Sequence, residues 1–393
     1  MPSLEDSAFS RVVSKQSAQE QSVSASKMAA SPEAAGVVKI APKYVIKPAK
    51  DVEPAEVFCC RFSPDDSMLA VSYADGTIRV FDADTGAEEF TLNNRQDAGA
   101  ETESPRGEGE EDALVKAMQP PTFPTTQVRW RPSGSESRTK NVLISVNAEN
   151  DGEVQHWHIK SGKCLHTIEE AGNQIFCLDY YYNGSIFATA GRDYKVRVYD
   201  EATKRLTTTL EGGDMQKTAG HSNRVFSVKF HSSNPNLLVS AGWDNTVQIW
   251  DTRKGQSVRS IYGAYICGDA IDLNDESSDI LTASYRTTDT LQVWDFGTGQ
   301  LKDTIPWRPQ GHLSSNECMA FTAEYSKPGS RYIIAGGSQN NEAKVFDAKS
   351  HQCLGVVSTP KPVFSLNFNA AATAFVVGSA DGCVRVLNFP KFH

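Results

Sequence analysis

The chain has 393 residues, of which 39% are hydrophobic and 22% charged, a composition typical of a globular protein. Its formal net charge of −9 argues against a nucleic-acid partner, because nucleic-acid binding relies on a basic face. No stretch approaches the roughly 18 apolar residues of a membrane-spanning helix, and the N-terminus lacks the apolar run of a secretory signal. We therefore expect a cytoplasmic protein without membrane contact.

Two segments fall outside the β-rich pattern of the chain. Residues 1–36 are rich in serine and alanine and have little to bury, so they are predicted to form a flexible tail. Residues 93–124 contain seven acidic and three basic residues together with several glycines and prolines, and cannot bury enough to fold alone. We interpret 93–124 as an acidic insert, which is either a docking loop or a tolerated surface insertion.

A six-residue pattern of alternating apolar and polar residues recurs through the rest of the chain. Its copies are TIRVFD (77–82), EVQHWH (153–158), KVRVYD (195–200), TVQIWD (246–251), TLQVWD (290–295), EAKVFD (342–347) and CVRVLN (383–388). Alternation with period two predicts half-buried strands. After the first gap the copies are about 40 to 52 residues apart, which is the repeat length of four-stranded propeller blades.

Each copy is preceded by two further strand patterns, and each of the first six is followed by a shorter one. Four strands in each of seven units predict an all-β fold, a single β-propeller over residues 37–389. The blades are expected at about 57–92, 126–168, 174–210, 221–261, 263–305, 314–357 and 361–389.

The fourth unit opens with Gly220-His221 and closes with Trp250-Asp251. With the ~40-residue period, this pattern resembles the WD40-repeat family. The resemblance covers roughly residues 37 to 389, with one complete unit and six degenerate ones. It implies a seven-bladed propeller that binds other proteins.

The last unit ends directly after its third strand, so it lacks an outer strand. A lone strand pattern, VVKIAPKYVIKPA (37–49), precedes the first unit. In the resembled family an N-terminal strand commonly completes the last blade, which removes an exposed sheet edge. We predict that residues 44–47 pair beside 384–387 and close the ring.

His221, Ser240 and Asp244 are the residue types of a hydrolase triad. However, Ser240 is matched by Ser72, Ser145 and Thr189 in other units, and aspartate and aromatic residues recur at the positions of Asp244 and Trp250. A catalytic group has no reason to recur around a ring. By resemblance to the family, His221, Ser240, Asp244 and Trp250 form a structural tetrad, and no catalytic residue is predicted.

Other chemistry finds little support in the sequence. His156 and His158 lie on one face of a predicted strand, but a metal site needs a third ligand and none is evident. The eight cysteines include no CxxC pair, and the glycine-rich segments lack phosphate-loop spacing. We therefore expect no metal, no cofactor and no small-molecule substrate.

The candidate partner-binding residues lie on the face that collects the turns between second and third strands. Trp243 and Arg192 stand next to such turns, and Trp307 and Arg308 lie on a link between blades. Tryptophan and arginine are enriched at binding hot spots. For Trp243, packing on a neighbouring blade is an equal alternative.

The expected function is a non-enzymatic protein-interaction scaffold, a subunit of a larger cytoskeletal or ciliary assembly. One alternative is a transient peptide-recognising adaptor, such as a ubiquitin-ligase substrate receptor. Another is an enzyme that uses the propeller mouth as its pocket, which convergent titratable residues there would favour.

Overall fold

The computed structural model describes residues 37–48, 53–92, 123–134, 139–212, 220–308 and 318–389. The expected tail at 1–36 and nearly all of the insert at 93–124 lie outside these described residues. Within them, no helix is long and apolar enough to cross a bilayer.

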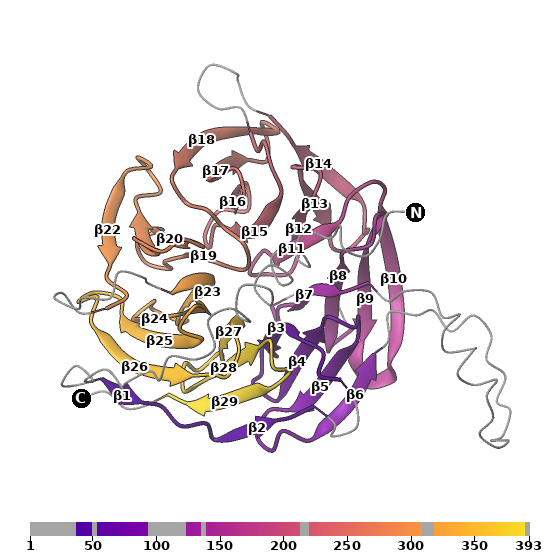
Figure 1. The fold of residues 1–393 in the computed structure, drawn as a ribbon. Helices are drawn as coiled ribbons and strands as arrows, with labels where there is room; N and C mark the ends of the chain where they lie inside the picture. The colour runs from indigo at the N-terminus through magenta and orange to yellow at the C-terminus, as the bar shows by residue number, and fades with distance from the viewer. Residues whose placement is uncertain are drawn as a thin grey trace, which may run out of the picture. The chain divides into compact units, whose positions relative to one another are not determined.

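Seven sheets, six with four strands and one with five, are arranged around a centre and form a β-propeller (Figure 1). Blades 1 to 4 comprise β3 (Val57–Phe62), β4 (Met68–Tyr73), β5 (Ile78–Asp82) and β6 (Glu88–Leu92); β7 (Thr125–Trp130), β8 (Val142–Asn147), β9 (Gly152–His158) and β10 (Lys163–Glu170); β11 (Ile175–Tyr180), β12 (Ile186–Gly191), β13 (Val196–Asp200) and β14 (Leu206–Leu210); and β15 (Val225–Phe230), β16 (Leu237–Gly242), β17 (Thr246–Asp251) and β18 (Gln256–Tyr262).

A short 3₁₀ turn, η2 (Ile159–Ser161), joins β9 to β10 in blade 2. Blades 5 to 7 follow the same strand order. Their strands are β19 (Ile271–Leu273), β20 (Ile280–Ala283), β21 (Leu291–Trp294) and β22 (Leu301–Ile305); β23 (Met319–Tyr325), β24 (Tyr332–Ser338), β25 (Glu342–Asp347) and β26 (Cys353–Ser358); and β27 (Val363–Phe368), β28 (Ala374–Ser379) and β29 (Val384–Asn388), with β1 (Val38–Lys39) and β2 (Tyr44–Ile46) at the outer edges of blades 6 and 7. The first strand of each blade lies innermost (Figure 1).

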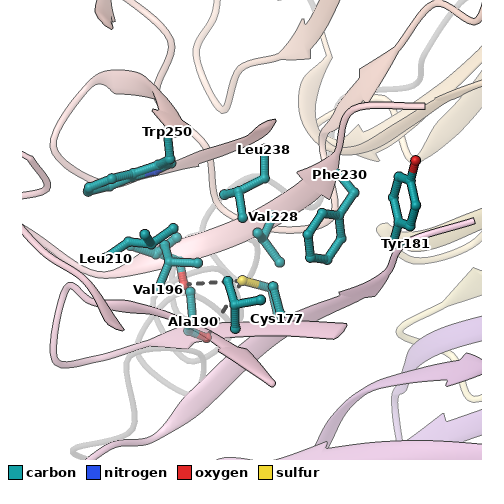
Figure 2. Packing of buried hydrophobic residues seen from close by; sticks show 12 residues of the cluster. Cys177, Tyr181, Ala190, Val196, Leu210, Val228, Phe230, Leu238 and Trp250 are labelled. Carbon is teal, nitrogen blue, oxygen red and sulfur yellow. Dashed lines mark hydrogen bonds between the residues drawn. The ribbon is translucent and has the colours of Figure 1, made fainter. Parts of the chain in front are cut away.

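The hydrophobic core lies between neighbouring blades. Between blades 3 and 4, Val196 and Leu210 face Leu238 and Trp250, all of them fully buried (Figure 2). The alternation seen in the sequence places these side chains on the inner faces of the sheets. Neighbouring sheets therefore bury their apolar faces against each other, in separate clusters between the blades.

The predicted ring closure is confirmed. Strand β2 pairs antiparallel with β29, with Tyr44 opposite Val386 and Ile46 opposite Val384. One feature differs from the expectation, because the 37–49 pattern forms two short strands. Strand β1 pairs parallel with β26 of blade 6, and the Ile40 amide continues this pairing to the Val356 carbonyl at 2.9 Å.

The closing segment also contacts blade 1. The Tyr44 hydroxyl donates to the Ala83 carbonyl at 2.6 Å. Gly86 has a φ of +74°, and a Cβ placed there would lie 2.7 Å from the Tyr44 ring. A glycine therefore meets both the backbone conformation and the close approach. Residues 38–46 thus link blades 6, 7 and 1.

Candidate functional site

His221, Ser240, Asp244 and Trp250 are joined by three hydrogen bonds in blade 4. The Trp250 indole donates to the Ser240 hydroxyl at 2.7 Å. Ser240 Oγ lies 2.7 Å from His221 Nε2, and His221 Nδ1 lies 2.7 Å from Asp244 Oδ2. The hydroxyl that accepts from Trp250 can donate to His221, whose other nitrogen then donates to Asp244. This chain of bonds connects the blade entry, the second and third strands, and the turn between them.

The same geometry leaves no room for hydrolase chemistry at Ser240. A nucleophile needs a substrate carbonyl beside it, with donors for the oxyanion. Ser240 and Trp250 are 0% exposed. The His221 side chain is equally inaccessible, and that of Asp244 is 2% exposed. The polar side-chain atoms of this tetrad bond to one another in the interior of the blade.

The residue at the position equivalent to Ser240 changes from blade to blade together with its aromatic partner. Trp157 donates to Ser145 at 2.9 Å in blade 2, and Trp294 donates to Thr282 at 2.9 Å in blade 5. The equivalence drawn for Ser72 is wrong, since Val71 pairs with Arg79 as Ser240 pairs with Gln248. The matching aromatic of blade 1, Phe81, has no donor. Both partners of the bond are thus replaced together, which avoids an unpaired buried polar group.

Blade 3 replaces the histidine with a carboxylate that the sequence analysis missed. Glu170 accepts from the hydroxyls of Thr189 and Tyr199, the latter at 2.9 Å. Its other oxygen accepts from the Asn173 amide at 2.7 Å and lies 3.2 Å from Arg197 Nη1. The signal was available, because Glu170 precedes its blade as His221 precedes blade 4.

We expect Ser240→Ala to lower the free energy of unfolding by about 1–2 kcal/mol, because it removes both hydrogen bonds of the central hydroxyl. Denaturant unfolding measures the change. Ser72→Ala is the matched control, since the buried Ser72 hydroxyl has no hydrogen-bond partner among the residues that the structure describes. Equal losses in the two variants would contradict a stabilising role for the network.

Trp243 packs against its surroundings. Its ring stacks on Tyr265 at 6.3 Å and lies 5.0 Å from Phe226, and the Arg224 guanidinium is 5.5 Å from its centre. The indole nitrogen donates to Cys267 Sγ at 3.1 Å. Trp243 is therefore half-buried against the start of blade 5.

The other three partner candidates differ in exposure. Arg192 is exposed on the expected face. Trp307 is 0% exposed and donates to Glu342 at 2.7 Å, which corrects its placement at the surface. It is buried because its ring packs on Phe346 and is covered by the Lys344 ammonium. Arg308 is half-buried and donates to Asn340 at 3.1 Å.

His156 and His158 lie in different environments. His156 is 1% exposed, and its Nε2 lies 3.2 Å from Glu201 Oε2. His158 is partly exposed, and its Nδ1 lies 2.7 Å from the Ser161 hydroxyl. Across the described part of the chain, no group of three or more His, Cys, Asp and Glu is placed to hold a metal ion.

Glu201 is the centre of a buried polar cluster between blades 2 and 3. Besides His156, it accepts from Tyr180 at 3.0 Å and Arg131 at 3.3 Å, and it pairs with Lys204. Burial alone would raise the pKa of Glu201, but the bonds from His156 and Lys204 lower that pKa to about 2. Burial also lowers the pKa of His156.

This cluster predicts a loss of stability on acidification. A folded-state pKa below the unfolded value means that the unfolded chain binds more protons as the pH falls. Protonation of His156 should therefore reduce stability as the pH falls below 6.5, and protonation of Glu201 should reduce it between pH 4.5 and about 2. Glu201 contributes up to about 3 kcal/mol above this window. Urea unfolding of Glu201→Gln at several pH values should show a shallower decline below pH 4.5 than the parent; parallel curves would contradict the assignment.

Seven side chains form a ring at the centre of the propeller, which we call the inner ring. Each is the next-to-last residue of the first strand of its blade, where a charge or amide interrupts an otherwise apolar pattern. The members are Arg61, Arg129, Asp179, Lys229, Asp272, Glu324 and Asn367. This ring was not predicted from the sequence, although a charged residue recurs at this repeat position in six of the seven first strands.

The acceptors of the inner ring bind the following blade. Asp179 accepts the Phe230 amide at 3.0 Å, and Asp272 accepts the Tyr325 amide at 2.8 Å. Glu324 and Asn367 do the same with the amides of Phe368 and Phe62, at 3.4 and 2.9 Å. Each bond satisfies a backbone donor of a buried strand.

The cations of the inner ring converge on one carboxylate, Asp269. Arg129 Nη2 lies 2.6 Å from Asp269 Oδ2, which Arg61 also contacts, and Lys229 Nζ lies 3.4 Å from Oδ1. Burial would raise the pKa of Asp269, but these cations hold that pKa well below its usual range. Blade 5 thus binds blades 1, 2 and 4 across the centre.

The backbone beside Asp269 explains how it reaches the centre. A Cβ at Gly268 would lie 2.4 Å from the Phe321 carbonyl oxygen of blade 6. A glycine therefore lets this segment approach the neighbouring inner strand more closely than another residue would. Strand β19 begins only at Ile271, so Asp269 lies in the segment before the strand and does not follow the strand's pairing.

Two cavities of about 410 and 470 Å³ open beside the inner ring. They share Arg61, Arg129, Glu324, Lys327 and Asn367, and are therefore adjacent. Their other lining residues include Pro64, Pro132, Ser232 and Ala370, which lie in the turns between first and second strands. We call this side of the ring the first-turn face. It is opposite to the face on which the sequence analysis placed its partner candidates.

Comparison with known proteins agrees with the architecture. A family model described as WD domain, G-beta repeat matches residues 51–82, 162–200 and 213–251. Protein tipD of Dictyostelium discoideum is 23% identical over 66% of this chain and 40% of its own length. Nuclear distribution protein nudF of Aspergillus niger is 22% identical over 74% of each chain, and a guanine nucleotide-binding protein subunit beta of Arabidopsis thaliana is 24% identical over 65% of each. The chain thus covers less than half of tipD.

Seven blades, the closing strand and the Trp–Ser–His–Asp network define a β-propeller built from WD-type repeats. The chain resembles the WD40-repeat family, whose model matches three of its segments and whose members are among its relatives. Proteins of this family act in general as scaffolds for interactions between proteins.

Proposed function

We propose that this chain is a non-enzymatic scaffold, a subunit that holds other proteins in a larger cytoplasmic assembly. The observation that carries the proposal is the enclosure of the Ser240 network. His221, Ser240 and Asp244, which have the residue types of a catalytic triad, are buried and hydrogen-bonded to one another within blade 4. The repeated blades present turns and edges to solvent. Such a ring provides rigid surface for partners.

The names of two relatives support a place in an assembly. One is a subunit of a guanine nucleotide-binding protein, and another is a nuclear distribution protein. The context that we propose for the assembly is cytoskeletal or ciliary. The acidic insert at 93–124 and the tail at 1–36 are further docking elements in this proposal.

The test compares the full-length protein with a version lacking residues 1–36 in the native cell, by proximity labelling and by sedimentation in rising salt. We expect the full-length protein in a large, salt-resistant complex, and the shortened one released from it. A full-length protein that sediments as a single chain and labels no common set of neighbours would overturn the proposal. Partners that remain with both versions but dissociate in salt would indicate the transient adaptor instead.

A further inference from the structure

The cavities on the first-turn face are lined by both signs of charge, but the cations there are already paired. Arg61, Arg129 and Lys229 contact Asp269, as described above. Lys327 lies 2.8 Å from Asp275 Oδ1 and donates to the Leu273 carbonyl at 2.8 Å. Four cations thus meet five carboxylates, because Asp179, Asp272, Asp275 and Glu324 also line the cavity and Asp269 contacts three of the cations. The site as a whole carries one excess negative charge.

Glu324 and Asp179 account for the unmatched charge. The Glu324 carboxylate accepts from the Asn367 amide at 3.0 and 3.1 Å, and it takes part in none of the ion pairs formed among the described residues. Asp179 has two cations near it, Lys229 and Arg129, the latter with Nε at 3.7 Å, and both also contact Asp269. Burial raises the pKa of both carboxyl groups. Both would therefore gain from a cation brought into the cavity.

An aromatic side chain stands at the rim of the same cavity. Tyr182 is 65% exposed and lines the cavity together with Asp179 and Tyr180. Its ring contacts Tyr181 edge to face, with ring centres 4.7 Å apart. Carboxylates below an exposed aromatic ring suit a planar cation, because the ring face attracts it and the carboxylate accepts its N–H donors.

We propose that this cavity on the first-turn face binds an arginine side chain of a partner protein, with Glu324 and Asp179 accepting from the guanidinium and Tyr182 stacking on it. The proposal rests on the scaffold function, since it names the chemistry of one partner contact. It places that contact on the face opposite to Trp243 and Arg192. Arginine is favoured over lysine because the planar guanidinium can stack and donate at once.

The test uses the purified full-length protein and a fluorescein-labelled glycine/serine peptide that carries arginines, with binding followed by fluorescence anisotropy. The same peptide with citrulline in place of arginine is the neutral control probe. Asp179→Asn combined with Glu324→Gln removes two negative charges at nearly constant shape. Glu89→Gln combined with Asp303→Asn removes two charges from exposed outer strands and is the matched control.

The cavity variant is expected to weaken binding of the arginine peptide by about tenfold or more, and Tyr182→Ala by roughly two- to fivefold. The control variant should bind like the parent, and the citrulline peptide should bind at least tenfold more weakly than the arginine peptide. Equal weakening in the cavity and control variants, or equal binding of both peptides, would overturn the site. Because sedimentation in the native cell is measured separately, such a result would leave the scaffold function standing, whereas a full-length protein found as a single chain would overturn that function.

Discussion

Asp269→Asn is expected to lower the free energy of unfolding by about 3–5 kcal/mol, the usual effect of removing one partner from a buried ion cluster. The substitution removes the carboxylate that Arg61 and Arg129 share, and the side chains of these two arginines are 7% and 9% exposed. Urea unfolding monitored by tryptophan fluorescence measures the change.

Two comparisons make this result specific to the cluster. Asp303→Asn, at an exposed position of β22, should change stability by less than about 0.5 kcal/mol. Arg61→Met should cost less in the Asp269→Asn background than in the parent, because it then removes an uncompensated charge. A loss below about 1 kcal/mol for Asp269→Asn would show that the ring is not joined through this carboxylate.

Removing residues 37–49 is expected to lower the free energy of unfolding by roughly 5 kcal/mol and the melting temperature by about 10 °C. The estimate follows from the apolar surface of Ile40, Tyr44 and Ile46, at about 1.5–3 kcal/mol for each fully buried side chain and about 2 °C per kcal/mol in a large domain. Ile40 is 6% exposed, and the other two pack against blade 7 and blade 1. The loss also exposes the edge of β29, so we expect aggregation on heating.

Differential scanning calorimetry measures the shift. A version lacking residues 95–120 is the control for chain removal, and it should melt like the parent because the acidic insert contributes no predicted strand. An unchanged melting temperature after loss of 37–49 would contradict the closure of the ring by β1 and β2.

Much of the fold could be predicted because a repeat states the same pattern several times. The strand around Trp250 is recognisable from its alternation alone, and six similar strands at blade spacing leave few folds other than a propeller. The hydrogen bonds of Ser240 followed the family pattern for a related reason, since a local motif holds all four residues in one blade. Ser72 was misplaced by one residue because strand register depends on pairing, which short motifs do not specify.

The sequence by itself determined which residues form strands, that seven blades are present, and that the segment near Tyr44 completes the last blade. The tertiary structure decided what depends on contacts between blades: that Trp307 is buried against blade 6, and that Asp269 joins Arg61 and Arg129. The physical reason is that periodicity reports the near neighbours of a residue within its own sheet. Contacts across the centre of the ring join blades hundreds of residues apart, and their partners become evident only once the ring is closed.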